Sequence, residues 1–263
     1  MVSSNLVAAV LTLLPAMGLL WLYLRRYEGY FEQNRLFFAL VVGLFAGTAV
    51  RFVEVALFPF DNPRLLQPEG DFSTGTLVYS FAYTMLGLAV LETFAKTAIL
   101  GAKKFRARKD TPYYGAAVGL GFGAMWTIQV IASPTHGLVF DAASGKMVTT
   151  TPALVLDLFV FLLGMGLLLA QAASAIWVGR GSGEGRLWRG AMQGTFWLAP
   201  GLGMFWVFLN GGDQVYPAIG AVAWGIFAMA FADRRVLERI VPQDVRDMVR
   251  RERRRETRKM NRD

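Results

Sequence analysis

The chain alternates between long apolar blocks and short polar connections. The apolar residues are not confined to one helical stripe, and they do not alternate as in a half-buried strand. Each block holds roughly twenty residues, the helical length that crosses about 30 Å of hydrocarbon. We therefore predict an all-α protein, a polytopic transmembrane bundle over residues 1–233, with about seven spans near 5–24, 36–58, 76–101, 113–133, 153–178, 188–209 and 215–232.

The first block differs from a cleaved signal peptide. No basic region precedes it, and Arg25 and Arg26 follow it where a small-residue cleavage site would stand. We predict that it is retained as a span.

Charge alternates between successive connections. Arg64 and Lys146 are the basic residues of two connections, and the one around Asp213 has none. Basic residues gather instead at 25–35, 103–109, 180–189 and from 234 onward. Because basic loops stay cytoplasmic, we predict an N-terminus outside and a C-terminus in the cytoplasm. The arginine-rich loops fit a multi-pass protein of a prokaryotic inner (cytoplasmic) membrane.

Residues 234–263 form a separate basic tail. Apolar residues recur there at near-helical spacing, which predicts an amphipathic helix along the membrane surface. Such a cluster attracts anionic lipid headgroups at about 1 kcal/mol per basic residue. Acidic residues are interleaved, which argues against nucleic acid as a partner.

Composition excludes several kinds of site. The chain has no cysteine, so disulfides and cysteine-ligated metals are excluded. Its only histidine, His136, lies in a connection and cannot build a two-histidine haem or multi-histidine metal site. We expect no metal and no cofactor.

Five ionisable residues lie away from the ends of the predicted spans, where each costs at least about 2.5–3.5 kcal/mol. Arg51 and Glu54 are three residues apart and can pair toward the outer side, near Asp157. Glu92 and Lys96 are four apart and form a second, deeper pair. These groups are either ion pairs that fix helix packing or a catalytic or transport site.

One predicted span is rich in glycine. Its glycines allow a neighbouring helix to approach closely, and the absence of a preceding strand argues against a nucleotide loop. Trp126 follows, and Gln129 is a polar residue at depth that we expect to hydrogen-bond to another helix. The residues of this glycine motif are Gly115, Gly119, Gly121, Phe122 and Gly123.

The third and fourth blocks carry three motifs in order: Glu92-Thr93-Phe94-Ala95-Lys96, a segment from Asp110 through Tyr114 to Gly115, and Gly119-Leu120-Gly121-Phe122. Their order and spacing resemble the PrsW-type glutamic intramembrane protease family over roughly residues 78–210. The family has Glu-Glu-x-x-Lys, an Asp-Gly-x-x-Tyr-Gly-like entry and Gly-x-Gly-Phe-x-x-x-Glu-Asn. Asn210 closes a weaker match in the sixth block.

The departures from the family pattern fall on its chemistry. Thr93 replaces the second glutamate of the first motif, and Trp126 and Thr127 replace Glu-Asn. No predicted span holds a histidine, and Asp157 falls only near the first family histidine. Peptide hydrolysis needs a base, an acid and an oxyanion stabiliser. The resemblance therefore implies the family fold with its hydrolytic site lost.

Three functions follow as hypotheses. The first is a catalytically inactive PrsW-like scaffold or subunit that binds other membrane proteins. The second is a divergent glutamic protease that uses Glu92, beside Lys96, with Glu54 or Asp157. The third is a small transporter or sensor, although the chain shows no inverted repeat. A retinal protein would need a lysine in 215–232, which has none. The oligomeric state is left open.

Overall fold

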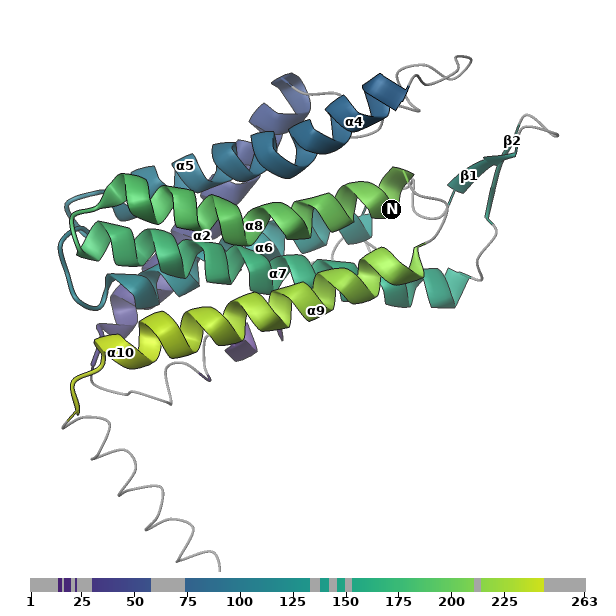
Figure 1. Ribbon diagram of the computed structural model, residues 1–263. Helices are drawn as coiled ribbons and strands as arrows, with labels where there is room; N and C mark the ends of the chain where they lie inside the picture. Colours follow the sequence, from purple (N-terminus) through teal and green to yellow (C-terminus); the bar gives the residue numbers. More distant parts are fainter. Residues whose placement is uncertain are drawn as a thin grey trace, which may run out of the picture.

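The computed structural model describes most of the predicted bundle (Figure 1). Its described residues are 14–15, 17–19, 22, 30–57, 74–132, 138–141, 146–149, 153–210 and 214–243. Long helices occupy the predicted blocks from the second to the seventh. The predicted first span lies largely outside the described residues, and the tail beyond residue 243 lies wholly outside them.

The helix bounds follow the predicted blocks closely. They are α2 (Gln33–Leu57), then α4 (Thr74–Ala82), the π-helical η2 (Tyr83–Leu88) and α5 (Ala89–Leu100) in succession, α6 (Thr111–Ala132), α7 (Ala153–Gly183), α8 (Leu187–Asn210), α9 (Val215–Ala232), η3 (Asp233–Leu237) and α10 (Glu238–Ile240). Two ends run longer than predicted. α7 continues past residue 178, and the last helix continues past residue 232 through η3 and α10.

The longer ends have packing reasons. Gly179 and Gly183 lie against the backbones of Pro112 and Arg108, so the glycine-rich end of α7 fits tightly beside the loop before α6. Val236 and Leu237 are buried in the core, although we predicted them as the start of a surface tail. The tail therefore leaves the bundle later than residue 234.

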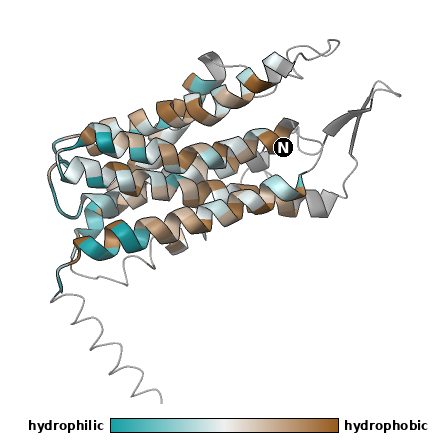
Figure 2. Ribbon diagram, viewed as in Figure 1, coloured by the Kyte–Doolittle hydropathy of each residue, from teal (hydrophilic) through white to brown (hydrophobic). Residues whose placement is uncertain are grey.

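The composition of these helices makes the chain a membrane protein. Within the described residues, 4 helical stretches are long and apolar enough to cross a membrane: Gln33–Glu54, Val78–Leu100, Leu158–Gly183 and Val215–Ile240. Figure 2 shows apolar residues along the bundle and hydrophilic residues gathered where the helices end at the left of the view.

A hairpin that the sequence pattern did not predict stands between α6 and α7. Strand β1 (Leu138–Asp141) pairs antiparallel with β2 (Lys146–Thr149), with Leu138 opposite Thr149. The short runs Leu-Val-Phe and Met-Val-Thr favour strand, but they are too short to stand out beside apolar blocks of twenty residues. The hairpin projects from the end of the bundle opposite α10 (Figure 1).

Beside α7, which contacts the most neighbouring helices, helix α6 lies inside the bundle. It packs against α2 on one side and α7 on the other, while α8 and α9 pack on α7 (Figure 1). Its aromatic and branched side chains are buried along most of its length, including Tyr113, Tyr114, Val118, Leu120 and Phe122. A helix buried on all sides is uniformly apolar rather than amphipathic, which is the pattern its sequence shows.

Glycines let the three central helices approach closely. A methyl group at Gly119 would lie 2.6 Å from the Cα atom of Ala172 in α7, and one at Gly123 would lie 2.6 Å from that of Leu168. Gly121 points the other way, and a methyl there would lie 2.5 Å from the Leu44 backbone nitrogen in α2. The glycines thus serve both faces of α6.

The connections rich in basic residues share one end of the bundle. The Tyr30 hydroxyl donates to the Ile240 carbonyl at 2.9 Å, and the Ser182 hydroxyl donates to the Leu100 carbonyl at 2.6 Å. The Tyr113 hydroxyl donates to the Leu237 carbonyl at 3.4 Å. Four chain segments that the charge pattern grouped together are therefore neighbours.

Gly119→Ala tests the close packing of α6 on α7. The added methyl would overlap the α7 backbone, which cannot shift as a side chain can, so we expect a loss of about 1–3 kcal/mol. Gly203→Ala is the control, because the nearest atom there is the flexible Met85 sulfur at 3.3 Å. Thermal unfolding in detergent measures both. Equal losses in the two variants would contradict this packing.

Candidate functional site

Glu92 and Lys96 lie on one face of α5 and are fully buried. The Lys96 Nζ atom is 3.9 Å from Glu92 Oε2, the pairing that a spacing of four residues predicts. Two opposite charges without water are stable only when hydrogen bonds satisfy their remaining donors and acceptors. The partners of this pair come from α6 and α7.

Gln171 of α7 bridges the two charges. Its Oε1 atom accepts a hydrogen bond from Lys96 Nζ, and its Nε2 atom donates to Glu92 Oε2. The Ser174 hydroxyl, one helical turn away, accepts from Lys96 at 3.4 Å. Gln171 was not among the predicted site residues. The available signal was a glutamine followed three residues later by a serine in an apolar span.

Trp126 of α6 completes the surroundings of the carboxylate. Its indole Nε1 donates to Glu92 Oε1 at 2.5 Å, and its ring packs edge-on against Phe205 at 4.9 Å. The Phe122 ring lies 5.3 Å from Lys96 Nζ. Phe122 belongs to the glycine motif of α6 and Trp126 follows it, so the close approach of that helix also positions these contacts.

The pair in α2 contacts the same group of residues. Arg51 Nη1 lies 3.1 Å from Glu54 Oε2, as their spacing predicts, and the Arg51 guanidinium stands 4.5 Å above the Trp126 ring. We expected two groups at separate depths. The structure joins them through Trp126, which contacts Arg51 with its ring face and Glu92 with its N–H.

The Glu92 carboxylate is fully buried and held by side chains on both of its oxygens. Each oxygen already accepts a hydrogen bond from a buried side chain, and Lys96 is the nearest cation. A general base must instead hold a water or a substrate proton within hydrogen-bond reach. Among the described residues, no group of three or more histidine, cysteine, aspartate or glutamate side chains is placed to bind a metal ion.

Three predicted site residues have undescribed side chains. Asp157, Gln129 and Asn210 lie on α7, α6 and α8, but their side chains fall outside the described part of the structure. Gly115, Gly119 and Gly121 are described, and their α-carbons lie against the backbones of α7 and α2.

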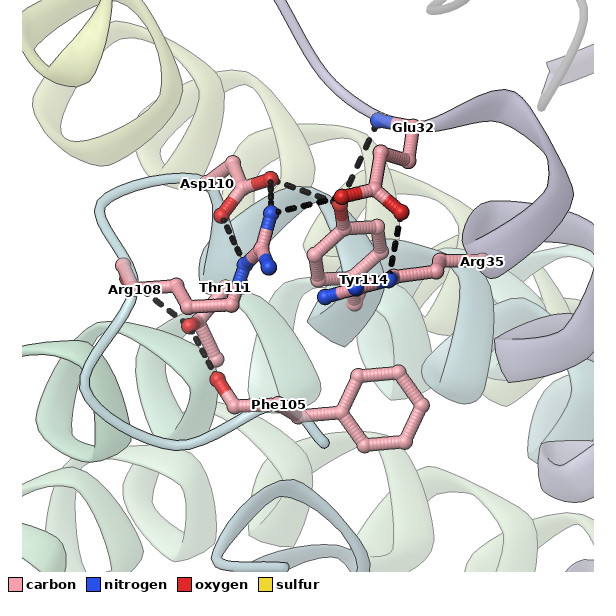
Figure 3. A network of polar contacts seen from close by, with 7 residues as sticks. All are labelled: Glu32, Arg35, Phe105, Arg108, Asp110, Thr111 and Tyr114. Carbon is pink, nitrogen blue, oxygen red and sulfur yellow. Dashed lines mark hydrogen bonds and ion pairs between the residues drawn. The ribbon is translucent and has the colours of Figure 1, made fainter. Parts of the chain in front are cut away.

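Asp110 and Tyr114 belong to a second polar network at the basic end of the bundle (Figure 3). The Tyr114 hydroxyl donates to Asp110 Oδ2 at 2.6 Å, and Arg108 donates to both Asp110 oxygens at 3.0 and 3.2 Å. Arg108 also reaches Glu32 Oε1 at 3.1 Å. The Glu32 backbone N–H donates to the Tyr114 hydroxyl. The network ties the loop before α6 to the start of α2.

Burial and charge act in opposite directions on Asp110. Burial alone would raise the pKa of its carboxyl, but the hydrogen bonds from Arg108 and Tyr114 outweigh it and hold the pKa below the ordinary value of 3.8. The same hydrogen bond raises the pKa of Arg108. The pair is therefore charged throughout the neutral range and serves as a structural clamp on the loop.

Asp110→Asn tests this clamp through pH. A carboxyl group whose pKa is lower in the folded than in the unfolded protein stabilises the fold at pH values above its ordinary pKa. That stabilisation is lost as the pH falls through the pKa of the folded state. We expect the variant to be less stable than the wild type at neutral pH, because it loses the charged hydrogen bonds from Arg108. The loss should be only about 1–2 kcal/mol, because solvent partly screens Arg108. The difference should narrow below about pH 4.

Thermal unfolding across that pH range measures the effect. Glu184→Gln, which removes an exposed carboxylate at the same end, is the control and should change stability little. A wild-type advantage over Asp110→Asn that grows on acidification would contradict the clamp.

Comparison with protein-family models, with curated proteins and with solved structures gave no match to this chain. No comparison therefore bears on the resemblance to the PrsW-type family, which was drawn from sequence motifs alone.

Proposed function

We propose that this chain is a PrsW-like integral membrane protein without hydrolytic activity that acts as a scaffold or partner-binding subunit. The observation that carries the proposal is the closed hydrogen bonding of the Glu92 carboxylate by Trp126 and Gln171, beside Lys96. A group so enclosed holds helices together and does not activate water.

The two positions where the resembling family has further glutamates support the same conclusion. Trp126 occupies one of them and presents an N–H donor to Glu92 instead of a second carboxylate. Thr93 occupies the other, and its buried methyl group packs toward Gly194 of α8. Each position contributes to helix packing rather than to an acid–base pair.

The alternative protease hypothesis pairs Glu92 with Glu54 or Asp157, and the Asp157 side chain lies outside the described part of the structure. The form that uses Glu54 needs the two glutamates to share a water. The contacts from one to the other run through the Trp126 ring and the Arg51 guanidinium. Arg51 already binds Glu54, so this glutamate is also held in an ion pair. The geometry favours the scaffold.

For the partner surface we propose an aromatic stripe on α2. Phe38, Phe45 and Phe52 recur every seven residues and are 45%, 70% and 73% exposed. A repeat of seven places side chains on one helix face, the spacing by which two helices interlock. The occupant that we propose is a transmembrane helix of another protein.

A purification experiment tests the proposed function. The protein is extracted into nanodiscs and its partners are identified by mass spectrometry, and it is separately mixed with a panel of single-span substrates. We expect a partner at fixed stoichiometry and no cleavage that depends on Glu92. The variant Phe45→Leu/Phe52→Leu should lose the partner, while Phe196→Leu on α8, similarly exposed, should keep it.

Either of two results would overturn this proposal. Substrate cleavage by the wild type that Glu92→Gln abolishes would restore the protease hypothesis. Retention of the partner by the α2 double variant would remove the proposed surface.

We also propose a seven-span topology, with the N-terminus outside and the basic end facing the cytoplasm of a prokaryotic inner membrane. The shared end of the basic connections supports it, because such loops stay cytoplasmic. The residues beyond 243 would then rest on anionic headgroups.

Single cysteines test this topology, since the native chain has none. We expect a membrane-impermeant thiol reagent to label Lys146→Cys in intact cells and Lys103→Cys only after permeabilisation. The reverse labelling pattern would show the opposite orientation, and labelling of both in intact cells would contradict the single crossing by α6 between them.

A further inference from the structure

Aromatic side chains form a continuous cluster where α7, α8 and α9 meet. Trp197 of α8 is its centre, with ring centroids 5.0 Å from Phe231, 5.5 Å from Trp224 and 6.3 Å from Trp177. The Trp224 indole N–H donates to the Trp197 carbonyl at 3.0 Å. The cluster therefore extends from the interior of the bundle toward its basic end.

Two arginines lie on the rings at that end. The Arg180 guanidinium carbon is 5.5 Å from the centre of the Trp177 ring, and that of Arg235 is 5.5 Å from the centre of Phe231. The two rings are themselves stacked at 6.2 Å. Two cations are thus gathered on one aromatic surface.

The charge on this surface is incompletely balanced. Arg180 pairs with the exposed Glu184 at 2.7 Å. Arg235 has no ion-pair partner within the part of the chain that the structure describes. Stacking occupies the face of a guanidinium and leaves its in-plane N–H donors available to an oxyanion.

An exposed apolar surface continues from these arginines toward the middle of the bundle. Phe227 of α9 and Phe196 of α8 are 54% and 63% exposed, and both rings contact Trp197, at 5.9 and 5.4 Å. Phe227 precedes Arg235 by about 12 Å along the helix. A cationic end joined to an apolar strip of this length matches a lipid rather than a soluble anion.

We propose that this surface is a binding site for an anionic phospholipid. The headgroup phosphate bonds the Arg180 and Arg235 guanidiniums, whose planar donors fit phosphate oxygens. An acyl chain lies along Phe227 and Phe196. A zwitterionic lipid binds less well, because its ammonium group opposes the same cations. This site is independent of the proposed scaffold function and is separate from the tail beyond residue 243.

Tryptophan quenching tests the site in the full-length protein. Nanodiscs of phosphatidylcholine receive increasing fractions of phosphatidylglycerol brominated on its acyl chains, and brominated phosphatidylcholine is the reference. We expect the anionic lipid to quench at a lower fraction than the reference. Arg180→Gln/Arg235→Gln should raise the required fraction about thirtyfold, from the contribution expected of two basic residues.

The control variant makes the same change in net charge at a position away from the site. Lys103→Gln/Arg106→Gln lowers the charge by the same amount in an exposed loop at the same end and should leave quenching unchanged. Arg180→Lys/Arg235→Lys should recover only part of the effect. Equal quenching by both brominated lipids, equal loss in the control, or reversal of quenching by inorganic phosphate would overturn the proposal.

Discussion

The fold depends on keeping one buried ion pair satisfied inside an apolar bundle. Glu92 and Lys96 are both fully buried, and neither charge could remain there without hydrogen bonds from neighbouring helices. Gln171 is suited to both partners because an amide offers an acceptor to the ammonium and a donor to the carboxylate. The pair therefore specifies how α5 meets α7.

Close helix approach makes these bonds possible. Gly119 and Gly123 bring α6 against α7, and Trp126 on the same helix then reaches Glu92. Arg51 of α2 stacks on the other side of this contact through the Trp126 ring. Polar bonds and glycine contacts thus reinforce each other, and a side chain added at the glycines would disturb both.

Much of this architecture could be predicted from the chain alone, because the blocks of apolar residues have the length of helices that cross a membrane. The pairing of Glu92 with Lys96 also followed from their spacing along one helix. The bridge by Gln171 did not, since it depends on which helices are neighbours, and no local spacing encodes that. The contact of Trp126 with both Glu92 and Arg51 also depends on which helices are neighbours. For this reason the predicted depths placed the two ion pairs apart, although Trp126 connects them in the structure.

The resemblance to a protease family and the geometry of the site lead to the same proposal. At a position where the resembling family has a glutamate, this chain has Trp126, whose N–H donates to Glu92. In the proposed function this contact serves helix packing. Partner binding on α2 and lipid binding near Arg235 would then use the outer surface of the bundle.

The most direct test of this account is a double-mutant cycle on Glu92 and Lys96, measured by reversible unfolding in detergent. Lys96→Met alone leaves a buried carboxylate without its cation and should cost about 3–5 kcal/mol. Glu92→Gln/Lys96→Met removes both charges and should recover most of that loss. If the two single substitutions each cost less than about 1 kcal/mol and add independently, the ion pair is not what organises the bundle.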